Sequence, residues 1–271
     1  MSEPRGKDRV EAHFSAQAEA YEGNVVPRFE PLAQRLVELA GLSAGQRVLD
    51  VASGTGLAAF LAARAVGPTG HVLATDFSAG MLDVARQKAA RLGLSNVSFA
   101  QMDAEAIDLP EASQDAALCA LGLFLLRQAP KAAADIRRVL VPGGRFSCSV
   151  WGAPEAHEPF VIFYGEYAKY DAKISGPGMG RPGVLERLLR EAGFAHVRIR
   201  REMGRQLFPD PEAFWQFFMS VGGPSAMVAR LPAEQQAAFQ ADVLRSLATR
   251  SGPRGLELRT EIVYGTGVRG G

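Results

Sequence analysis

The segment at residues 47–56, RVLDVASGTG, decides the expected fold of this chain. Its first six residues form a short apolar run that ends in a glycine-rich turn, a pattern typical of a buried strand. Residues 57–66 are rich in Ala and Leu and stop at Gly67 and Pro68, so they predict a helix. We therefore expect a strand that passes through a glycine-rich turn directly into a helix.

The same alternation of strand and helix continues along the rest of the chain. Short apolar runs predict six further strands, at 71–76, 96–101, 115–121, 145–150, 197–202 and 256–268. Helical patterns lie between them at 81–92, with Ser78 as the expected N-cap, and at 130–140 and 183–192. Strands joined by helices imply crossover connections and a parallel sheet that has helices on both faces.

Charge balance and hydropathy exclude several classes of protein. The chain has 271 residues, with 30 Lys and Arg against 29 Asp and Glu, and a formal net charge of +1. This balance argues against a nucleic-acid partner, because phosphate contacts need a cationic excess. No apolar run approaches the roughly 20 residues of a membrane span, and the first residues lack the order of a signal peptide. We expect a soluble, cytoplasmic protein.

The cysteines and histidines give no sign of a metal centre. Cys119 and Cys148 each lie inside an apolar run, where a free cysteine usually acts as a small buried hydrophobe. The four histidines are scattered along the chain and show no ligand spacing. The sequence therefore predicts no metal site.

Three successive predicted strands each end in an acidic residue, namely Asp50, Asp76 and Asp103. Ligands of parallel sheets bind at the carboxyl ends of the strands, where these acids meet. Gly54 and Gly56 follow the first strand and let the backbone approach a ligand closely. Taken alone, these glycines and Asp76 also satisfy a relaxed dinucleotide fingerprint, which leaves a nicotinamide cofactor open.

Asp50 separates the two cofactor classes. A carboxylate at this position would repel a pyrophosphate, but it would suit a cofactor that has a cationic ammonium group and no phosphate. S-adenosylmethionine has both properties. Asp103 is placed to accept a hydrogen bond from an exocyclic amine such as that of adenine. The three acids together favour S-adenosylmethionine over a nicotinamide cofactor.

With these residues the chain resembles the class I S-adenosylmethionine-dependent methyltransferases. Four segments carry the resemblance: 48–56 for the first motif, 75–82 for the ribose-binding motif, 101–105 for the adenine-binding motif and 138–144 for the turn before the fifth strand. Ala52 stands where many members have Gly. The match is close over 41–152 and then looser, in the manner of the small-molecule methyltransferases of ubiquinone and menaquinone biosynthesis.

The resemblance implies a fold and a domain organisation. The fold would be α/β, a Rossmann-like doubly wound, seven-stranded and mostly parallel sheet, with an antiparallel last strand and a helical cap. Residues 1–40 would form an N-terminal helical lid segment. Residues 41–271 would form the methyltransferase domain, with cap insertions at about 153–180 and 209–251.

The resemblance also implies a set of residues that bind S-adenosylmethionine. Tyr21 resembles the N-terminal aromatic residue that closes over the cofactor in related enzymes, with ordinary lid packing as the alternative. Met81 would pack on the adenine or simply in its own helix. The full set of expected cofactor-binding residues is Tyr21, Asp50, Ala52, Ser53, Gly54, Gly56, Asp76, Phe77, Met81, Asp103, Ala104, Glu105, Ala120, Leu121 and Gly122.

No catalytic motif is visible, and methyl transfer does not require one. The sulfonium methyl is already activated, so the protein has to align the nucleophile and exclude water. A base is needed only where the nucleophile must lose a proton. The weak candidates are His157, His13 and Glu158. His157 would face the substrate from a cap loop, and an exposed surface histidine is the alternative.

The acceptor is constrained only by what the sequence lacks and by its aromatic residues. The Asn/Asp-Pro-Pro-aromatic signature of amino-methyltransferases is absent after the fourth predicted strand, which favours O- or C-methylation of a small molecule. Aromatic side chains in the expected cap would form a lid over an apolar or aromatic substrate, or pack against one another. A nicotinamide-dependent oxidoreductase and a non-catalytic S-adenosylmethionine-binding protein are the competing interpretations. The oligomeric state stays open.

Overall fold

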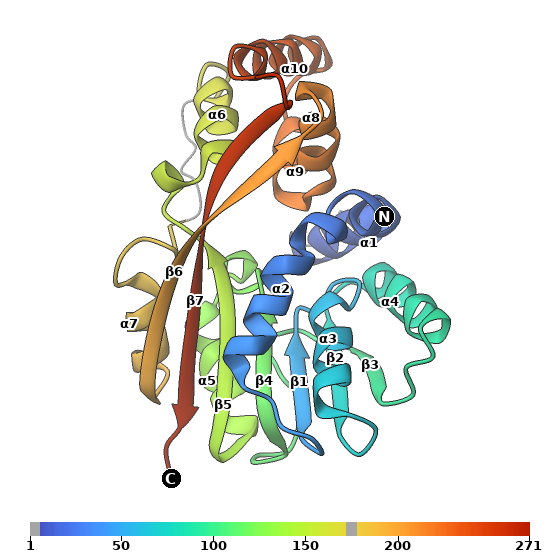
Figure 1. Cartoon of the computed structure of the whole chain (residues 1–271), viewed down its shortest axis with the longest axis vertical. Helices are drawn as coiled ribbons and strands as arrows, with labels where there is room; N and C mark the ends of the chain where they lie inside the picture. The colour runs from blue at the N-terminus through green and yellow to red at the C-terminus, as the bar shows by residue number, and fades with distance from the viewer. Residues whose placement is uncertain (1–5, 172–177) are drawn as a thin grey trace.

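Seven strands form one sheet in the computed structural model, which describes residues 6–171 and 178–271 (Figure 1). The strands are β1 (Arg47–Val51), β2 (His71–Asp76), β3 (Val97–Gln101), β4 (Gln114–Ala120), β5 (Leu140–Trp151), β6 (Phe194–Phe208) and β7 (Leu256–Arg269). Their order across the sheet is β3-β2-β1-β4-β5-β7-β6. Only β7 runs against its neighbours β5 and β6. The expected Rossmann-like sheet with an antiparallel last strand is confirmed.

Helices cover both faces of this sheet (Figure 1). One face carries α2 (Val26–Ala40), α3 (Leu57–Val66) and α4 (Ala79–Arg91), and the other carries α5 (Ala129–Val139) and α7 (Val184–Glu191). Alanines of α3 pack directly on buried valines of β1 and β2, because small side chains let the helix approach the strands closely. The predicted bounds of β1, α3 and β2 agree with the structure to within one residue.

A cap rises from one end of the sheet, where β6 and β7 extend as a two-stranded ribbon (Figure 1). It holds α6 (Glu158–Tyr167), α8 (Pro211–Ser220), α9 (Gly222–Val228) and α10 (Ala233–Ala248), and short 3₁₀ turns lie at Leu123–Leu125 and Pro154–Ala156. The sequence predicted β6 only over 197–202, which is too short. Pairing continues to Phe208 opposite Leu256, so the partner strand rather than the local sequence keeps 203–208 extended.

Aromatic side chains fill the interior of the cap. Phe239 of α10 is fully buried, and its ring lies 5.1 Å from that of Phe163 and 5.9 Å from that of Trp215, centroid to centroid. Phe214 and Phe218 stack at 5.0 Å. The aromatic residues expected in the cap therefore pack against one another.

Helix α1 (Gly6–Asn24) bridges the sheet domain and the cap. The Ser15 hydroxyl shares a hydrogen bond with that of Ser78 at the start of α4, at 2.8 Å. Towards the cap, the Asn24 amide donates to the Ser220 hydroxyl at 2.9 Å. Of the expected lid and cap segments, residues 1–5 and 172–177 lie outside the described residues.

Three smaller observations complete the fold. Strand β5 begins at Leu140 rather than at the predicted residue 145, because Leu140 already pairs with Gln114. Both cysteines are buried, as expected for Cys119 and Cys148. Within 6–171 and 178–271, no helix is long and apolar enough to cross a membrane, and no group of three or more His, Cys, Asp or Glu could hold a metal ion.

Candidate functional site

The glycine-rich loop between β1 and α3 has a backbone that few residues tolerate. Ala52, Gly54 and Gly56 all have positive φ, at 54°, 53° and 87°. A Cβ on Gly56 would lie 2.5 Å from the ring of Phe60, so this position accepts only glycine without rearrangement. The loop therefore turns sharply and leads its amides to the start of α3, an arrangement suited to a ligand at a helix N-terminus.

Asp50 lies beneath this loop and is fully buried. Neither carboxyl oxygen has a hydrogen-bond partner among the described residues. Burial raises the pKa of Asp50 to about 8; the backbone N–H of Ala59, which lies near the carboxyl without forming a hydrogen bond, offsets part of the rise, and the nearby charge of Asp76 adds to it. The acid is thus held largely neutral at pH 7, and a nearby cation would favour its ionised form.

Asp76, at the end of β2, fixes the neighbouring backbone. Its carboxylate accepts hydrogen bonds from the amides of Gly54 and Ser78, both at 2.8 Å. Burial raises the pKa of Asp76, and these backbone hydrogen bonds oppose the rise. Ser78 in turn caps α4 by accepting from the Met81 amide, which confirms the predicted N-cap. One carboxylate thus joins the glycine loop to the start of α4.

The acids that follow β3 each accept a hydrogen bond from a backbone amide. Asp103 is half-buried and accepts from the Glu105 amide at 2.9 Å. Glu105 is buried and accepts from the Gln128 amide at 2.7 Å, at the start of α5. Glu105 therefore supports a helix N-terminus on the far side of its loop.

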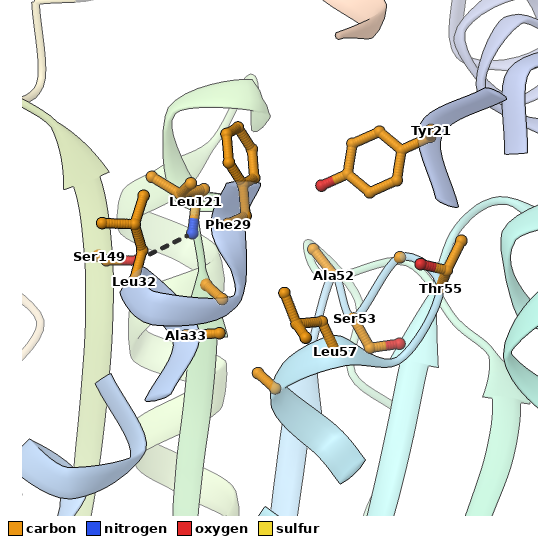
Figure 2. Close-up of a pocket in the computed structure, with 13 residues that line it drawn as sticks. Tyr21, Phe29, Leu32, Ala33, Ala52, Ser53, Thr55, Leu57, Leu121 and Ser149 are labelled. Carbon is orange, nitrogen blue, oxygen red and sulfur yellow. Dashed lines mark hydrogen bonds between the residues drawn. The ribbon is translucent and has the colours of Figure 1, made fainter. Parts of the chain in front are cut away.

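A pocket opens between the glycine loop and the N-terminal helices (Figure 2). Its lining combines the loop with α1, α2, the start of α3 and the ends of β4 and β5. The residues are Tyr21, Phe29, Leu32, Ala33, Ala52, Ser53, Gly54, Thr55, Leu57, Ala58, Ala120, Leu121 and Ser149. No side chain from α6 to α10 is among them. The pocket is therefore built by the sheet domain and the N-terminal helices.

The pocket gathers some of the expected cofactor residues and leaves others outside its lining. Those that line it are Tyr21, Ala52, Ser53, Gly54, Ala120 and Leu121, and those that do not are Asp50, Gly56, Asp76, Phe77, Met81, Asp103, Ala104, Glu105 and Gly122. Met81 packs with Ala18 of α1, so it contributes to the helix interface. The roles of all these residues in binding stay predictions.

Seven lining residues were missed from the sequence, among them Phe29 and Leu32. The pattern of α2 offered a partial signal, because Phe29, Ala33 and Leu36 share one helix face and are buried. That spacing shows that the face is covered, but not by what. Ser149 gave no signal, since it looks like any inward residue of β5.

Leu121, in the apolar wall of the pocket, has a strained backbone. Leu121 has φ of 53°, unusual for a residue with a branched side chain, and its amide donates to the Ser149 carbonyl at 3.1 Å and hydroxyl at 3.2 Å. A Cβ on Gly122 would meet that of Ala52 at 2.8 Å. The ends of β1 and β4 thus abut without room for another side chain. Strain of this kind concentrates at ligand sites.

None of the three candidate bases lines the pocket. His13 donates from Nε2 to the Gly222 carbonyl at 2.8 Å, which ties α1 to α9, and Glu158 pairs with Arg259 of the ribbon at 3.1 Å. His157 is 2% exposed, so the exposed surface position is wrong for it, and its role as a base stays a prediction. Its Nδ1 accepts from the Phe160 amide at 3.3 Å and caps α6.

The glycine loop carries side-chain hydroxyls without hydrogen-bond partners, which fit a cofactor that joins an amino acid to adenosine. The hydroxyl oxygens of Ser53 and Thr55 are buried and have no partner among the described residues. Both residues line the pocket, and Asp50, whose carboxyl has no partner among the described residues, precedes them on β1. The hydroxyls can donate hydrogen bonds to the cofactor's carboxylate, and the buried acid can attract its cationic centre. These groups therefore fit S-adenosylmethionine. The described residues that line the pocket include no Lys or Arg that could pair with a pyrophosphate.

Comparison with known proteins shows the family to which the chain belongs. A methyltransferase-domain family matches residues 48–144. The ubiquinone/menaquinone biosynthesis C-methyltransferase UbiE of Erwinia tasmaniensis is 32% identical over 187 residues, which cover 69% of each chain. UbiE of Pseudomonas aeruginosa is 41% identical over 122 residues, 45% of this chain and 48% of that one, so the chain spans about half the length of this relative.

A solved structure agrees in fold. The YcgJ protein of Bacillus subtilis superposes with a TM-score of 0.63 at 19% identity, covering 88% of this chain and 98% of its own. This likeness supports the sheet and its helices over nearly the whole chain. On the sequence relationship, the chain belongs to the class I S-adenosylmethionine-dependent methyltransferases of the UbiE type, and its cofactor is S-adenosylmethionine.

Proposed function

We propose that the chain transfers the methyl group of S-adenosylmethionine to a small, uncharged aromatic acceptor. The observation that carries this proposal is the pocket, which joins the glycine loop to an apolar wall made by Phe29, Leu32 and Leu121. Among the described residues that line it there is no Asp, Glu, Lys, Arg or His. Such walls suit a flat apolar ring and give a charged acceptor no counter-ion.

Carbon is the proposed site of methylation, with oxygen as the alternative. The relatives described above are C-methyltransferases of ubiquinone and menaquinone biosynthesis, which favours a quinol-type ring here. In either case the acceptor atom gains the methyl group and loses one proton, and S-adenosylhomocysteine is the second product. No ionisable base lies among the pocket residues, so we assign the chain the tasks of alignment and exclusion of water.

Each part of the site has a proposed task. Bound S-adenosylmethionine supplies a methyl group that is already activated as a sulfonium. Asp76 would hold the ribose hydroxyls while keeping the loop in place through the Gly54 amide. The hydroxyls of Ser53 and Thr55 would meet the polar end of the cofactor. Phe29 and Leu32 would cover the acceptor and exclude water.

The domain organisation is part of the proposal. Residues 1–40 would act as the lid segment, because α1 and α2 supply Tyr21, Phe29, Leu32 and Ala33 to the pocket. Residues 41–271 would form the methyltransferase domain, with the cap segments at about 153–180 and 209–251 as insertions. The cap would act indirectly, through the contacts of α1 with α8 and α9.

The test is a methyl-transfer assay with ¹³C-methyl S-adenosylmethionine and 1,4-naphthoquinol. NMR of the product distinguishes a ring methyl from a methoxy group, and we expect a ring methyl. Asp76→Asn should weaken cofactor binding about 10- to 100-fold in calorimetry, since hydrogen bonds to a charged group are lost.

The competing interpretations give different results in the same experiment. Cofactor binding with no transfer to any phenolic or quinol acceptor would favour a non-catalytic S-adenosylmethionine-binding protein. Binding of NAD in place of S-adenosylmethionine would favour an oxidoreductase. Full cofactor affinity in Asp76→Asn would contradict the assigned site.

A further inference from the structure

The pocket contains few polar groups, and they are distributed unevenly. Tyr21, Ser53, Thr55 and Ser149 are the lining residues whose side chains carry an oxygen. Ser53 and Thr55 belong to the glycine loop, on the side proposed for the cofactor. The Ser149 hydroxyl accepts from the Leu121 amide at 3.2 Å and so helps to hold the strained backbone of Leu121 in place. The hydroxyl of Tyr21, which comes from α1, is the polar group that approaches the apolar wall formed by Phe29, Leu32 and Leu121.

The ring of Tyr21 lies over the glycine loop, and its hydroxyl reaches beyond it. A Cβ on Gly54 would lie 4.0 Å from Cε1 of Tyr21, which is ordinary van der Waals contact. Figure 2 shows the hydroxyl pointing away from α1, into the space between Phe29 and Ala52. The Tyr21 and Phe29 rings meet edge to face with centroids 6.5 Å apart. The hydroxyl therefore stands where the loop gives way to the apolar wall.

The position of Tyr21 is fixed by its surroundings. Its carbonyl accepts from the Val25 amide at 2.9 Å, at the junction of α1 and α2. Its ring packs in the small cluster that includes Ala18 and Met81. A side chain held in this way presents its hydroxyl at a defined place, which is what orientation of a substrate requires.

The Tyr21 hydroxyl has no hydrogen-bond partner among the described residues. Burial raises the pKa of Tyr21 above its usual value, and the charges of Asp76 and Glu22 raise it further. The group therefore stays protonated at neutral pH and can donate a hydrogen bond. It is unsuited to act as a general base.

We propose that the Tyr21 hydroxyl donates a hydrogen bond to an oxygen of the aromatic acceptor and so determines both the choice and the orientation of the ring. This inference rests on the proposed function, because it takes the acceptor to be an oxygenated aromatic ring. The ring would lie against Phe29, Leu32 and Leu121. Its hydroxyl or carbonyl oxygen would accept from Tyr21, which fixes the ring carbon presented to the cofactor.

The test uses equilibrium binding, so it does not depend on turnover. The full chain is saturated with S-adenosylhomocysteine, and dissociation constants are measured for 1-naphthol and for naphthalene. We expect the wild-type chain to bind 1-naphthol about five- to tenfold more tightly than naphthalene, the worth of one neutral hydrogen bond. In Tyr21→Phe this preference should disappear, while the affinity for naphthalene and for S-adenosylhomocysteine stays the same.

A matched control removes another tyrosine hydroxyl. Tyr170 donates to Asp242 at 2.8 Å at the cap surface, outside the pocket, so Tyr170→Phe should keep the wild-type preference. The inference is overturned if Tyr21→Phe still prefers 1-naphthol, if it mainly loses S-adenosylhomocysteine, or if the wild-type chain binds neither ring. Ring binding with the expected preference but without methyl transfer would leave Tyr21 as the determinant and reject the proposed function.

Discussion

The sheet domain and the cap each bury an ionisable side chain that lacks a full set of hydrogen bonds. Asp50 of β1 has no partner at either oxygen, and His157 before α6 has none at Nε2 among the described residues. Burial raises the pKa of Asp50 to about 8 and lowers the pKa of His157 to about 3. The same cause keeps both groups neutral, but it gives their contributions to stability opposite pH dependence.

The surroundings of the two groups explain why only Asp50 is proposed for the site. Asp50 lies beneath a loop that lines the pocket, where a cationic cofactor would favour its ionised form. His157 stacks on Phe160 at 3.9 Å and meets Trp151 edge to face at 4.7 Å, centroid to centroid. An unpartnered polar group therefore indicates a site only where a pocket lies beside it. In the cap it marks a helix end packed among aromatic rings.

The largest effect should come from breaking the aromatic core of the cap. Phe239→Ala removes a fully buried ring with four aromatic neighbours, and should lower the free energy of unfolding by about 3–5 kcal/mol. Cofactor affinity measured by calorimetry should stay within about twofold under conditions where the protein is folded, because no cap helix lines the pocket. If Phe239→Ala lowered both the free energy of unfolding and the cofactor affinity, the cap and the cofactor pocket would not be independent of each other.

The next largest effect is expected from replacing Asp50 by Asn, which should stabilise the folded protein. The folded pKa of about 8 lies above the unfolded value near 3.8, so the folded state binds the extra proton and stability falls as pH rises between them. Asp50→Asn should raise the free energy of unfolding by about 3 kcal/mol at pH 6 and change it little at pH 4. It should also weaken cofactor binding.

Urea unfolding at the two pH values measures the Asp50 effect. Asp83→Asn is the control, because Asp83 is an exposed acid on α4 paired with Arg86. An equal gain from both variants would show that net charge, rather than burial, is responsible.

His157 should show the opposite slope. Its folded pKa of about 3 lies below the unfolded value near 6.5, so the unfolded state binds the proton and stability is lost as pH falls through this window. The loss between pH 7 and pH 5 should be about 2 kcal/mol. His157→Asn keeps an oxygen to cap the Phe160 amide but does not titrate, so its unfolding free energy should change less with acid. If the free energy of unfolding changed with pH equally in the wild-type chain and in His157→Asn, His157 would not be the source of the pH dependence.

The smallest effect tests the strain of the loop. Ala52→Gly relieves a positive φ and should raise stability by about 0.5–1 kcal/mol, after the greater freedom of glycine in the unfolded chain is subtracted. Ala65→Gly, on the exposed side of α3, should lower stability by a similar amount. Thermal unfolding of both variants checks the signs. A loss at both positions would mean that the Ala52 conformation carries no strain.

Much of the sheet domain could be predicted from the sequence because its signals are local. The apolar run of β1, the helix stop at Gly67 and the cap at Ser78 each depend on a few neighbouring residues. The sequence also predicted that the acids at three strand ends lie at the same edge of the sheet, because parallel strands all end at one edge. The whole length of β6 did not follow, because pairing with β7 holds residues 203–208 extended.

The candidate site could be predicted only in part, for the same reason. Asp50 and Asp76 stand out from the local pattern, but the pattern did not show that Asp50 is covered by the loop it precedes. Phe29 and Leu32 belong to a helix whose face is visibly apolar, yet the surface that it covers is distant in sequence. The sequence places His157 in a cap loop, facing the substrate or exposed, and its burial depends on Trp151 and on packing within the cap.

The sequence alone determined the strand, the glycine turn and the helix of the first unit, together with the family and the cofactor. Steric limits on φ and ψ act within a few residues, so they are written directly in the order of side chains. The tertiary structure decided the second wall of the pocket, the place of the Tyr21 hydroxyl and the protonation of Asp50 and His157. These depend on which distant segments exclude water from a group, and that is known only once the chain has folded.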